Sequence, residues 1–170
     1  MLTWTLLFAL ALPAAPAATP PDATVVVVVR HAEKATDDPR DPLLTPAGEA
    51  RAQSLARRLA GAGLDAAYAT QYRRTQLSAA PAAAQAGVAV TVRPVDADNA
   101  ATYGPDLARD LRALPAGSTA LVVGHSNTVP AIVAAISGQA AAEMPETEYD
   151  RYTVIVLDAD GKARVFVSTY

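Results

Sequence analysis

The stretch VVVVVRHAEK, residues 25–34, decides the fold. Five consecutive valines are too few for a helix and all are β-branched, so they predict a strand that is buried on both faces. Strands of this kind lie in the centre of parallel α/β sheets. The valines are followed at once by the ionisable residues Arg30, His31, Glu33 and Lys34. Ionisable groups are therefore concentrated at the carboxyl end of a central strand.

The composition indicates one globular domain without a nucleic-acid surface. The 170 residues are 51% apolar and 18% charged, which supplies a sizeable core and argues against disorder. The net charge is -3 and no long basic run occurs, so nucleic acid is not an expected partner. The chain contains no cysteine, which excludes disulfides and thiolate metal sites.

The first residues have the pattern of a targeting segment. Residues 2–12 are almost wholly apolar, and APA at residues 15–17 has the small-x-small form of a signal-peptidase site. The apolar run is short for a membrane span. We predict a signal peptide over residues 1–18, export to the periplasm or medium, and a domain over residues 19–170 without membrane contact. An N-terminal membrane anchor or a cytoplasmic start is the alternative, because no Lys or Arg precedes the apolar run.

The rest of the chain alternates predicted strands with predicted helices. Strands are expected at residues 25–29, 65–69, 88–92, 119–123, 152–157 and 163–168. Helices are expected from Thr45-Pro46 to Gly61 or Gly63, over 73–86 with a kink or break at Pro81, over 106–114, and after 127 as far as Gly138. This alternation predicts an α/β fold of three layers, with a mostly parallel sheet flanked by helices.

Two of these strands end in a histidine. The first runs into Arg30-His31 and the fourth into Gly124-His125, and the chain has no other histidine. Functional sites of open α/β sheets lie beyond the carboxyl ends of the strands. One histidine there would be read as a structural hydrogen-bonding residue. Two of them, with an arginine and a glycine beside them, favour a functional site at one edge of the sheet.

A third cationic segment follows the second strand. Arg73 and Arg74 lie where that strand turns into a helix, and guanidinium groups beside a helix N-terminus suit phosphate oxygens. Arg73 by itself is expected to be a solvated side chain. Zinc held by the two imidazoles and a carboxylate is an alternative, but Arg30 beside His31 would repel a dication and suits an anion. The expectation is therefore an anion site without a metal or a cofactor.

Together these motifs resemble the histidine phosphatase superfamily, the phosphoglycerate-mutase-like group. The residues that carry the resemblance are Arg30-His31-Ala32-Glu33, Leu44-Thr45-Pro46-Ala47-Gly48, Thr70 with Arg74-Thr75 and Ser78, and Gly124-His125-Ser126. Thr70-Gln71 stands where the family usually has Ser-Pro, and the spacing places Arg74 on the family's catalytic arginine. The compact length is similar to the small phosphohistidine-phosphatase-like branch. The resemblance implies a phosphoglycerate-mutase-like fold over the mature chain.

The resemblance also implies a chemistry. The protein is expected to be a metal-independent phosphatase that acts on a phosphorylated small molecule or phosphoprotein. His31 is implied as the nucleophile that forms a phosphohistidine, which water then hydrolyses. Arg30 and Arg74 are expected to lower the pKa of His31 and to stabilise the phosphoryl oxygens. His125, protonated or donating a hydrogen bond, is expected to be a second clamp.

The remaining candidate residues have less defined roles. Asp96 and Asp98 lie in the polar loop comparable to the segment that carries the family's proton donor, and each is otherwise an ordinary turn aspartate. Glu33 is expected to bind substrate or to orient a site residue by hydrogen bonding. Ser126 and Asn127 are expected to cap the next helix, with contact to bound phosphate as a second role.

Two other functions stay open on the sequence. A non-catalytic phosphate- or phosphoprotein-binding module is one, because no proton donor is assigned. A phosphoglycerate-type mutase is the other, although short connections offer no lid and export would separate it from glycolytic substrates. The loops at residues 37–44, 96–105 and 139–151 carry no readable code for substrate, and no motif defines an oligomeric state.

Overall fold

The structure, a computed structural model, describes residues 22–170; the predicted signal peptide, residues 1–18, lies outside these described residues. The strands are β1 (Thr24–Arg30), β2 (Leu64–Ala69), β3 (Val90–Val92), β4 (Thr119–Gly124), β5 (Arg151–Leu157) and β6 (Ala163–Thr169). The helices are α1 (Pro46–Arg58), α2 (Arg73–Ala86), α3 (Ala100–Arg112) and α4 (Val129–Ser137). Within this part of the chain no helix is both long and apolar enough to cross a membrane.

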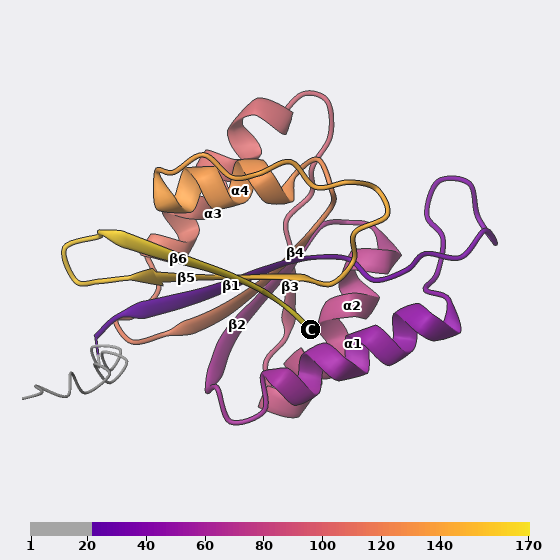
Figure 1. Cartoon of the computed structure of the whole chain (residues 1–170), viewed down its shortest axis with the longest axis horizontal. Coiled ribbons are helices and arrows are strands. Elements are labelled where there is room, and N and C mark those ends of the chain that lie inside the picture. Colours follow the sequence, from indigo (N-terminus) through magenta and orange to yellow (C-terminus); the bar gives the residue numbers. More distant parts are fainter. Residues whose placement is uncertain (1–21) are drawn as a thin grey trace, which may run out of the picture.

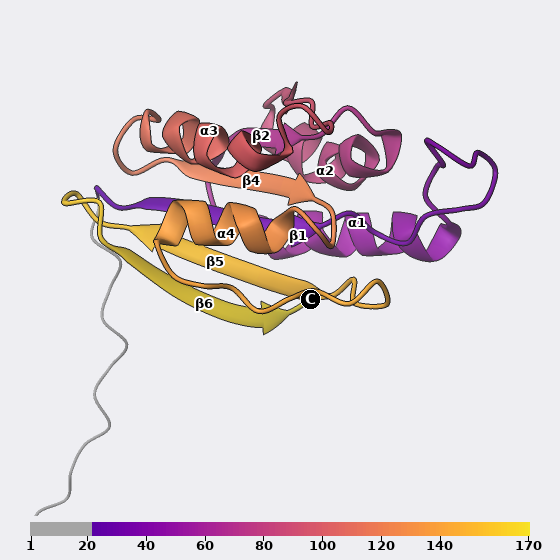
Figure 2. The same cartoon turned by 90° about the horizontal axis from the view of Figure 1, so that it is seen from above.

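The strands form one sheet in the order β3-β2-β4-β1-β5-β6 (Figure 1). The pairs β1–β4, β2–β4 and β2–β3 are parallel, whereas β5 and β6 run antiparallel at one side. Helices α1 and α2 cover one face, and α3 and α4 cover the other (Figure 2). The predicted three-layer, mostly parallel α/β fold is therefore confirmed.

The valine run divides the core into two halves. Val26 and Val28 pack with residues of α3 and α4, whereas Val27 and Val29 pack with residues of α1 and α2. Successive side chains of a strand point to opposite faces, so a continuous β-branched run fills both layers at once. The carboxyl end of β1 is consequently held in the middle of the sheet.

The ends of the first two helices follow local sequence signals. Helix α1 begins after Thr45, whose Oγ1 accepts a hydrogen bond from the N–H of Gly48 at 3.1 Å. Helix α2 ends at Gly87, which has a φ of 73° in the left-handed region that glycine adopts readily. The break expected at Pro81 does not occur, because buried alanines on either side keep α2 against the core.

The third helix begins earlier than predicted. It starts at Ala100 instead of residue 106 and continues through Pro105, where one backbone donor is lost. Tyr103 and Leu107 form part of a buried stripe on α3, and this burial offsets the missing hydrogen bond. Gly104 lets α3 approach α4 closely, since a Cβ there would lie 3.1 Å from the carbonyl oxygen of Ala131. The early start brings the first turn of α3 to the functional edge of the sheet.

Candidate active site

The ends of β1 and β4 bring the two histidines together. Arg30 is in register with Gly124, and the N–H of His31 donates to the Gly124 carbonyl at 2.9 Å. The ring centroids of His31 and His125 lie 5.3 Å apart with an interplanar angle of 67°. The expected meeting of the two imidazoles at one edge is therefore found in the structure, and the parallel pairing of the strands explains it.

The ring of His31 is held in a defined tautomer. Its Nδ1 lies 2.7 Å from the carbonyl oxygen of Ala32, and a carbonyl can only accept, so Nδ1 carries the proton. The pKa of His31 is lowered from 6.5 to about 4, mainly by burial and also by the nearby Arg30 and Arg74, against the raising effect of the Ala32 hydrogen bond. At neutral pH the imidazole is uncharged and Nε2 carries a lone pair.

The ring of His125 is neutral as well, and it is fixed by a chain of hydroxyl groups. The Thr75 hydroxyl lies 2.7 Å from the Tyr72 carbonyl, which can only accept from it. The Thr70 hydroxyl then donates to Thr75 Oγ1 at 2.9 Å and accepts from Nε2–H of His125, also at 2.9 Å. Burial lowers the pKa of His125 to about 3, with His31 and Arg74 adding to the effect. His125 is therefore a neutral hydrogen-bond donor to Thr70, and its expected role as a second clamp on the phosphoryl group stays a prediction.

Arg74 brings a guanidinium group from the start of α2. Its side chain is 14% exposed, lies over the Tyr72 ring at 4.3 Å, and donates from Nη1 to the Arg40 carbonyl at 3.3 Å. Burial lowers the pKa of Arg74, while Asp41 at 3.9 Å counteracts this. Its Nε is buried without a hydrogen-bond partner among residues 22–170. The neighbouring Arg73 is exposed, as expected.

Arg30 holds a loop instead of presenting an open clamp, which corrects the sequence prediction. The side chain is 1% exposed. Its Nη1 donates over 2.7–3.1 Å to the carbonyl oxygens of Pro145, Glu146 and Glu148. Its guanidinium carbon lies 4.2 Å from the ring centroid of Tyr149. Only Nε of Arg30 stays buried without a partner in the described chain, so most of its donors organise the loop before β5.

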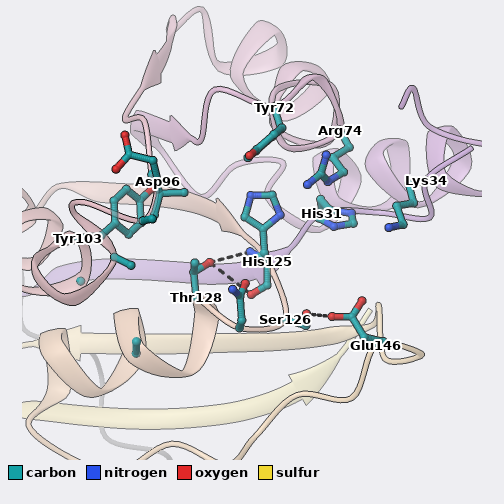
Figure 3. Close-up of a pocket in the computed structure, with 16 residues that line it drawn as sticks. His31, Lys34, Tyr72, Arg74, Asp96, Tyr103, His125, Ser126, Thr128 and Glu146 are labelled. Carbon is teal, nitrogen blue, oxygen red and sulfur yellow. Dashed lines mark hydrogen bonds between the residues drawn. The ribbon is translucent and has the colours of Figure 1, made fainter. Parts of the chain in front are cut away.

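The histidines open into a cavity of about 580 Å³ that has two ends (Figure 3). We define the histidine end as the part lined by His31, Lys34, Arg74, His125, Ser126 and Glu146. We define the distal end as the part lined by Val95, Asp96, Ala97, Ala100, Tyr103 and Ala131. In Figure 3, Asp96 and Tyr103 lie on one side of His125, and Lys34 and Glu146 lie on the other. The cavity is thus cationic near the histidines and carries a single carboxylate at its distal end.

Glu146 belongs to the histidine end, and sequence reasoning missed it. Its carboxylate accepts from Nη2 of Arg30 at 2.8 Å and from the hydroxyl of Ser126. The Ser126 hydrogen bond lowers the pKa of Glu146, and the charge of Arg30 lowers it further. The side chain remains 74% exposed. No local pattern distinguishes Glu146 from the other glutamates of its loop, so only the fold reveals it.

The three predicted carboxylates have different positions. Glu33 does not line the cavity, because Arg51 of α1 binds its carboxylate from Nε at 3.0 Å and from Nη2 at 2.7 Å. The expectation that Glu33 binds substrate is therefore wrong. Asp98 also lies outside the cavity lining, and its N–H donates to Oδ1 of Asp96 at 2.9 Å. Of these three, Asp96 alone lines the cavity.

Ser126 and Asn127 line the cavity but do not cap the following helix. The N-cap of α4 is Thr128, whose Oγ1 accepts from the N–H of His125 at 2.8 Å. The expected capping role is therefore wrong. Asn127 is exposed at the cavity and available to a ligand, whereas the Ser126 hydroxyl is bound to Glu146.

The described residues show no constellation typical of a metal centre. Within residues 22–170 no group of three or more His, Asp or Glu side chains is placed to hold an ion. The arrangement instead offers two neutral imidazoles and two buried guanidinium N–H groups that lack partners. Such donors are satisfied by an anion with several oxygens.

Comparison with known families agrees with this anion site. Residues 26–95, which include His31 and Arg74, match the model of the histidine phosphatase superfamily (branch 1). Over these residues the chain is similar to this superfamily. This match supports a phosphatase or mutase-like role. No curated protein sequence matches the chain.

Solved structures of several phosphatases share the fold. The protein histidine phosphatase SixA with tungstate superposes with a TM-score of 0.61 at 17% identity, covering 85% of this chain and 96% of SixA. The mycobacterial glucosyl-3-phosphoglycerate phosphatase gives 0.65 at 16% identity, covering 87% and 98%. Phosphoserine phosphatase of Entamoeba histolytica with 3-phosphoglyceric acid gives 0.61 at 13%, covering 86% and 98%. At these identities the likeness establishes the fold of the described chain.

Proposed function

We propose that the protein is a metal-independent phosphatase that hydrolyses a phosphomonoester or a phosphorylated side chain through a phosphohistidine. The observation that carries this proposal is the state of His31. Its Nδ1–H is bound to the Ala32 carbonyl, its lowered pKa keeps it neutral, and its Nε2 lone pair is available. The unpartnered Nε of Arg74, which lines the cavity, supplies a donor for the phosphoryl oxygens.

In the first step the Nε2 lone pair of His31 attacks phosphorus. The N–P bond forms as the P–O bond to the leaving group breaks in line. The leaving oxygen takes its proton from solvent, and the carboxylate of Asp96, the one predicted donor that lines the cavity, relays that proton. The phosphorylated imidazole becomes a cation, and the Nδ1–H bond to the Ala32 carbonyl stabilises that charge.

In the second step water attacks the phosphohistidine. The new O–P bond forms, the N–P bond breaks, and its electron pair returns to Nε2 of His31. The proton of the attacking water passes to a phosphate oxygen or to solvent, and inorganic phosphate leaves. His125 remains neutral through its Nε2–H bond to Thr70, so it orders the site without adding a positive charge.

The deciding experiment is turnover of p-nitrophenyl phosphate, whose good leaving group needs no proton donor. We expect hydrolysis by the wild type in EDTA, and a loss on the order of 10³-fold or more in His31→Ala. Rapid acid quench should trap one phosphoryl group on the chain, absent in His31→Ala. Tight phosphate binding without turnover would favour the binding module instead. Transfer of the trapped phosphoryl group to an added phosphoglycerate would favour a mutase.

We further propose that the mature protein is exported, because its leader has the signal-peptide pattern described above. Mass spectrometry of the protein from its native host should find an N-terminus near residue 19. A full-length chain in the membrane fraction would favour the N-terminal anchor, and a full-length chain in the cytosol would contradict export.

A further inference from the structure

The two ends of the cavity differ in what they offer a substrate. The histidine end supplies the guanidinium of Arg74 and the ammonium of Lys34 around the two imidazoles, and its one carboxylate, Glu146, is bound by Arg30 and Ser126. The distal end contains no Lys or Arg side chain among the described residues that line it, and Asp96 is its one ionisable carboxylate. Arg93 nearby is bound to Asp110 at 2.6 Å and is not part of the lining.

In-line transfer fixes where the leaving group must lie. The attacking Nε2 of His31 and the leaving oxygen occupy opposite sides of the phosphorus. In Figure 3 the side of His125 away from His31 holds Asp96 and Tyr103. A phosphoryl group bound between His31 and that side of His125 would direct its leaving group into the distal end.

The walls of the distal end are small and apolar. Ala97, Ala100 and Ala131 line it from the loop before α3, from α3 itself and from α4. Asp96 is fixed there, since its Oδ1 accepts from the N–H groups of Asp98 at 2.9 Å and Asn99 at 3.1 Å. A negatively charged leaving group would meet this carboxylate without a cation to offset it, whereas a cationic one would be attracted.

Gln71 connects the loop that carries Asp96 to the histidine end by hydrogen bonds to Val95. Its side-chain Nε2 donates to the carbonyl of Val95 at 2.7 Å, and its Oε1 accepts from the N–H of Val95 at 3.0 Å. Both backbone groups of the residue before Asp96 are thereby held by one side chain. Gln71 stands between Thr70, which fixes His125, and Arg74. Proline, usual here in the resembled motif, could make neither bond.

We propose that the distal end is a leaving-group subsite for a compact alcohol that is uncharged or carries an amino group, and that Gln71 positions its wall. The proposal rests on the phosphatase function proposed above and names the substrate class of that site. Asp96 discriminates by charge, and Gln71 keeps Asp96 at a fixed place relative to the transferring phosphoryl group. Gln71 is a positioning residue, because it acts through Val95 and Asp96.

Binding to His31→Ala, measured by calorimetry, tests the subsite without turnover. The probes are inorganic phosphate, phosphoethanolamine and phosphoglycolate, which share a phosphoryl group and differ in what is attached. We expect phosphoethanolamine to bind more tightly than phosphoglycolate. Adding Asp96→Asn should reduce the ratio of the two affinities, phosphoethanolamine over phosphoglycolate, by about fivefold, the size typical of an exposed ion pair. Equal affinities for the two esters, or a ratio unchanged by Asp96→Asn, would overturn the charge selectivity.

Gln71→Leu tests the positioning role in the same background. It should remove most of the preference for phosphoethanolamine over phosphoglycolate, while the affinity for inorganic phosphate changes by less than about twofold. Gln85→Leu, the same change at the exposed far end of α2, is the matched control. It should change neither the preference between the two esters nor the affinity for inorganic phosphate. Gln71→Glu, which keeps the acceptor and loses the donor, provides a second variant if Gln71→Leu folds poorly. Parallel losses for phosphate and for both esters would overturn the positioning role.

The outcomes separate this inference from the proposed function. Selective binding in His31→Ala together with wild-type inactivity toward p-nitrophenyl phosphate would reject only the phosphatase. Turnover of p-nitrophenyl phosphate with no selectivity between the two esters would reject only the subsite.

Discussion

The histidine end and the distal end of one cavity are built in different ways. The histidine end is formed by residues at the ends of β1 and β4 and the start of α2, and His31 and His125 are buried there. The distal end is formed by the loop after β3 and the first turns of α3 and α4, and most of its residues are exposed. The sheet edge therefore supports the reacting groups, while a loop and the first turns of two helices line the space for the leaving group.

This difference indicates how chemistry and selectivity are divided. Changes at the histidine end should affect every phosphorylated compound, because all share the phosphoryl group. Changes at the distal end should affect compounds according to what is attached to phosphorus. The predictions below test this division, beginning with the largest expected effect.

Arg74→Ala compared with Arg73→Ala gives the strongest contrast within one helical turn. Arg74 is part of the cavity and Arg73 is exposed. We expect Arg74→Ala to lower kcat/KM on the order of 10²–10³-fold, as for the loss of a group that binds transition-state charge. Arg73→Ala should stay within about threefold of the wild type, the range of a solvated surface change. Steady-state kinetics with p-nitrophenyl phosphate measures both.

Arg74→Lys sharpens that comparison. It restores the charge but not the planar fork of donors, so recovery should be partial. Similar losses in Arg73→Ala and Arg74→Ala would mean that the helix N-terminus, not the Arg74 side chain, binds the phosphoryl group.

The two buried histidines make the stability of the histidine end depend on pH. The pKa values of His31 and His125 fall from 6.5 to about 4 and about 3 on folding. As pH falls below 6.5 the unfolded chain binds protons first, so stability is fully present above 6.5 and is lost as pH falls through about 4. Each histidine should cost about 2 kcal/mol at pH 5 relative to pH 7.

Thermal unfolding measures this pH dependence. The expected fall in Tm between pH 7 and pH 5 is about 4–8 °C per histidine. Because the chain has two histidines, His31→Asn and His125→Asn should each remove part of the slope. If the change of Tm with pH is the same in both variants as in the wild type, the pH dependence arises from carboxylates elsewhere and not from the histidines. In the wild type, kcat/KM should decline on the acid side only near pH 4, where His31 becomes protonated.

Thr70→Val tests whether the hydroxyl chain orders His125. The substitution keeps the side-chain shape and leaves Nε2–H of His125 without its acceptor at 2.9 Å. We expect a loss of about 1–3 kcal/mol in stability, as for an unsatisfied buried donor, and a roughly tenfold lower kcat/KM. Thr91→Val on the exposed side of β3 is the matched control. Unaltered kinetics in Thr70→Val would show that Thr70 is not needed to position His125.

Gly104→Ala tests the distal end and should have the smallest effect. The added Cβ would lie 3.1 Å from the Ala131 carbonyl and push α3 away from α4. We expect about 1 kcal/mol of destabilisation, as for mild overpacking. Chemical denaturation measures this change. Inhibition by inorganic phosphate should not change, whereas KM for phosphomonoesters should rise a few-fold. Equal changes in the inhibition constant of phosphate and in KM for phosphomonoesters would contradict the division between the two ends.

Several features of this site could be predicted because local patterns specify them. Five β-branched residues specify β1, and Thr45-Pro46 specifies the start of α1. The two histidines follow from the same logic, since parallel strands β1 and β4 end at the same edge. Arg74 followed from the motif spacing, and its place in the cavity agrees with that assignment.

Other features depended on partners far away in the sequence. Arg30 binds carbonyl groups more than a hundred residues later, and Glu33 binds Arg51 on α1. Glu146 lies in the site on a loop that Arg30 holds by hydrogen bonds to its carbonyl groups. Helix α3 starts after Asn99, which makes no side-chain cap hydrogen bond, and Gly104 lets the helix lie close to α4.

The amino-acid sequence alone determined the α/β class, the central strand and the meeting of His31 with His125, because strand periodicity and strand ends are local properties. Only the tertiary structure decided which ionisable side chains face the cavity. Arg30 binds the loop before β5, and Glu33 binds Arg51. Glu146 and Val95 line the cavity, and Gln71 holds Val95 in place. A polar side chain binds whichever complementary group the folded loops bring within reach, and that choice is made in three dimensions.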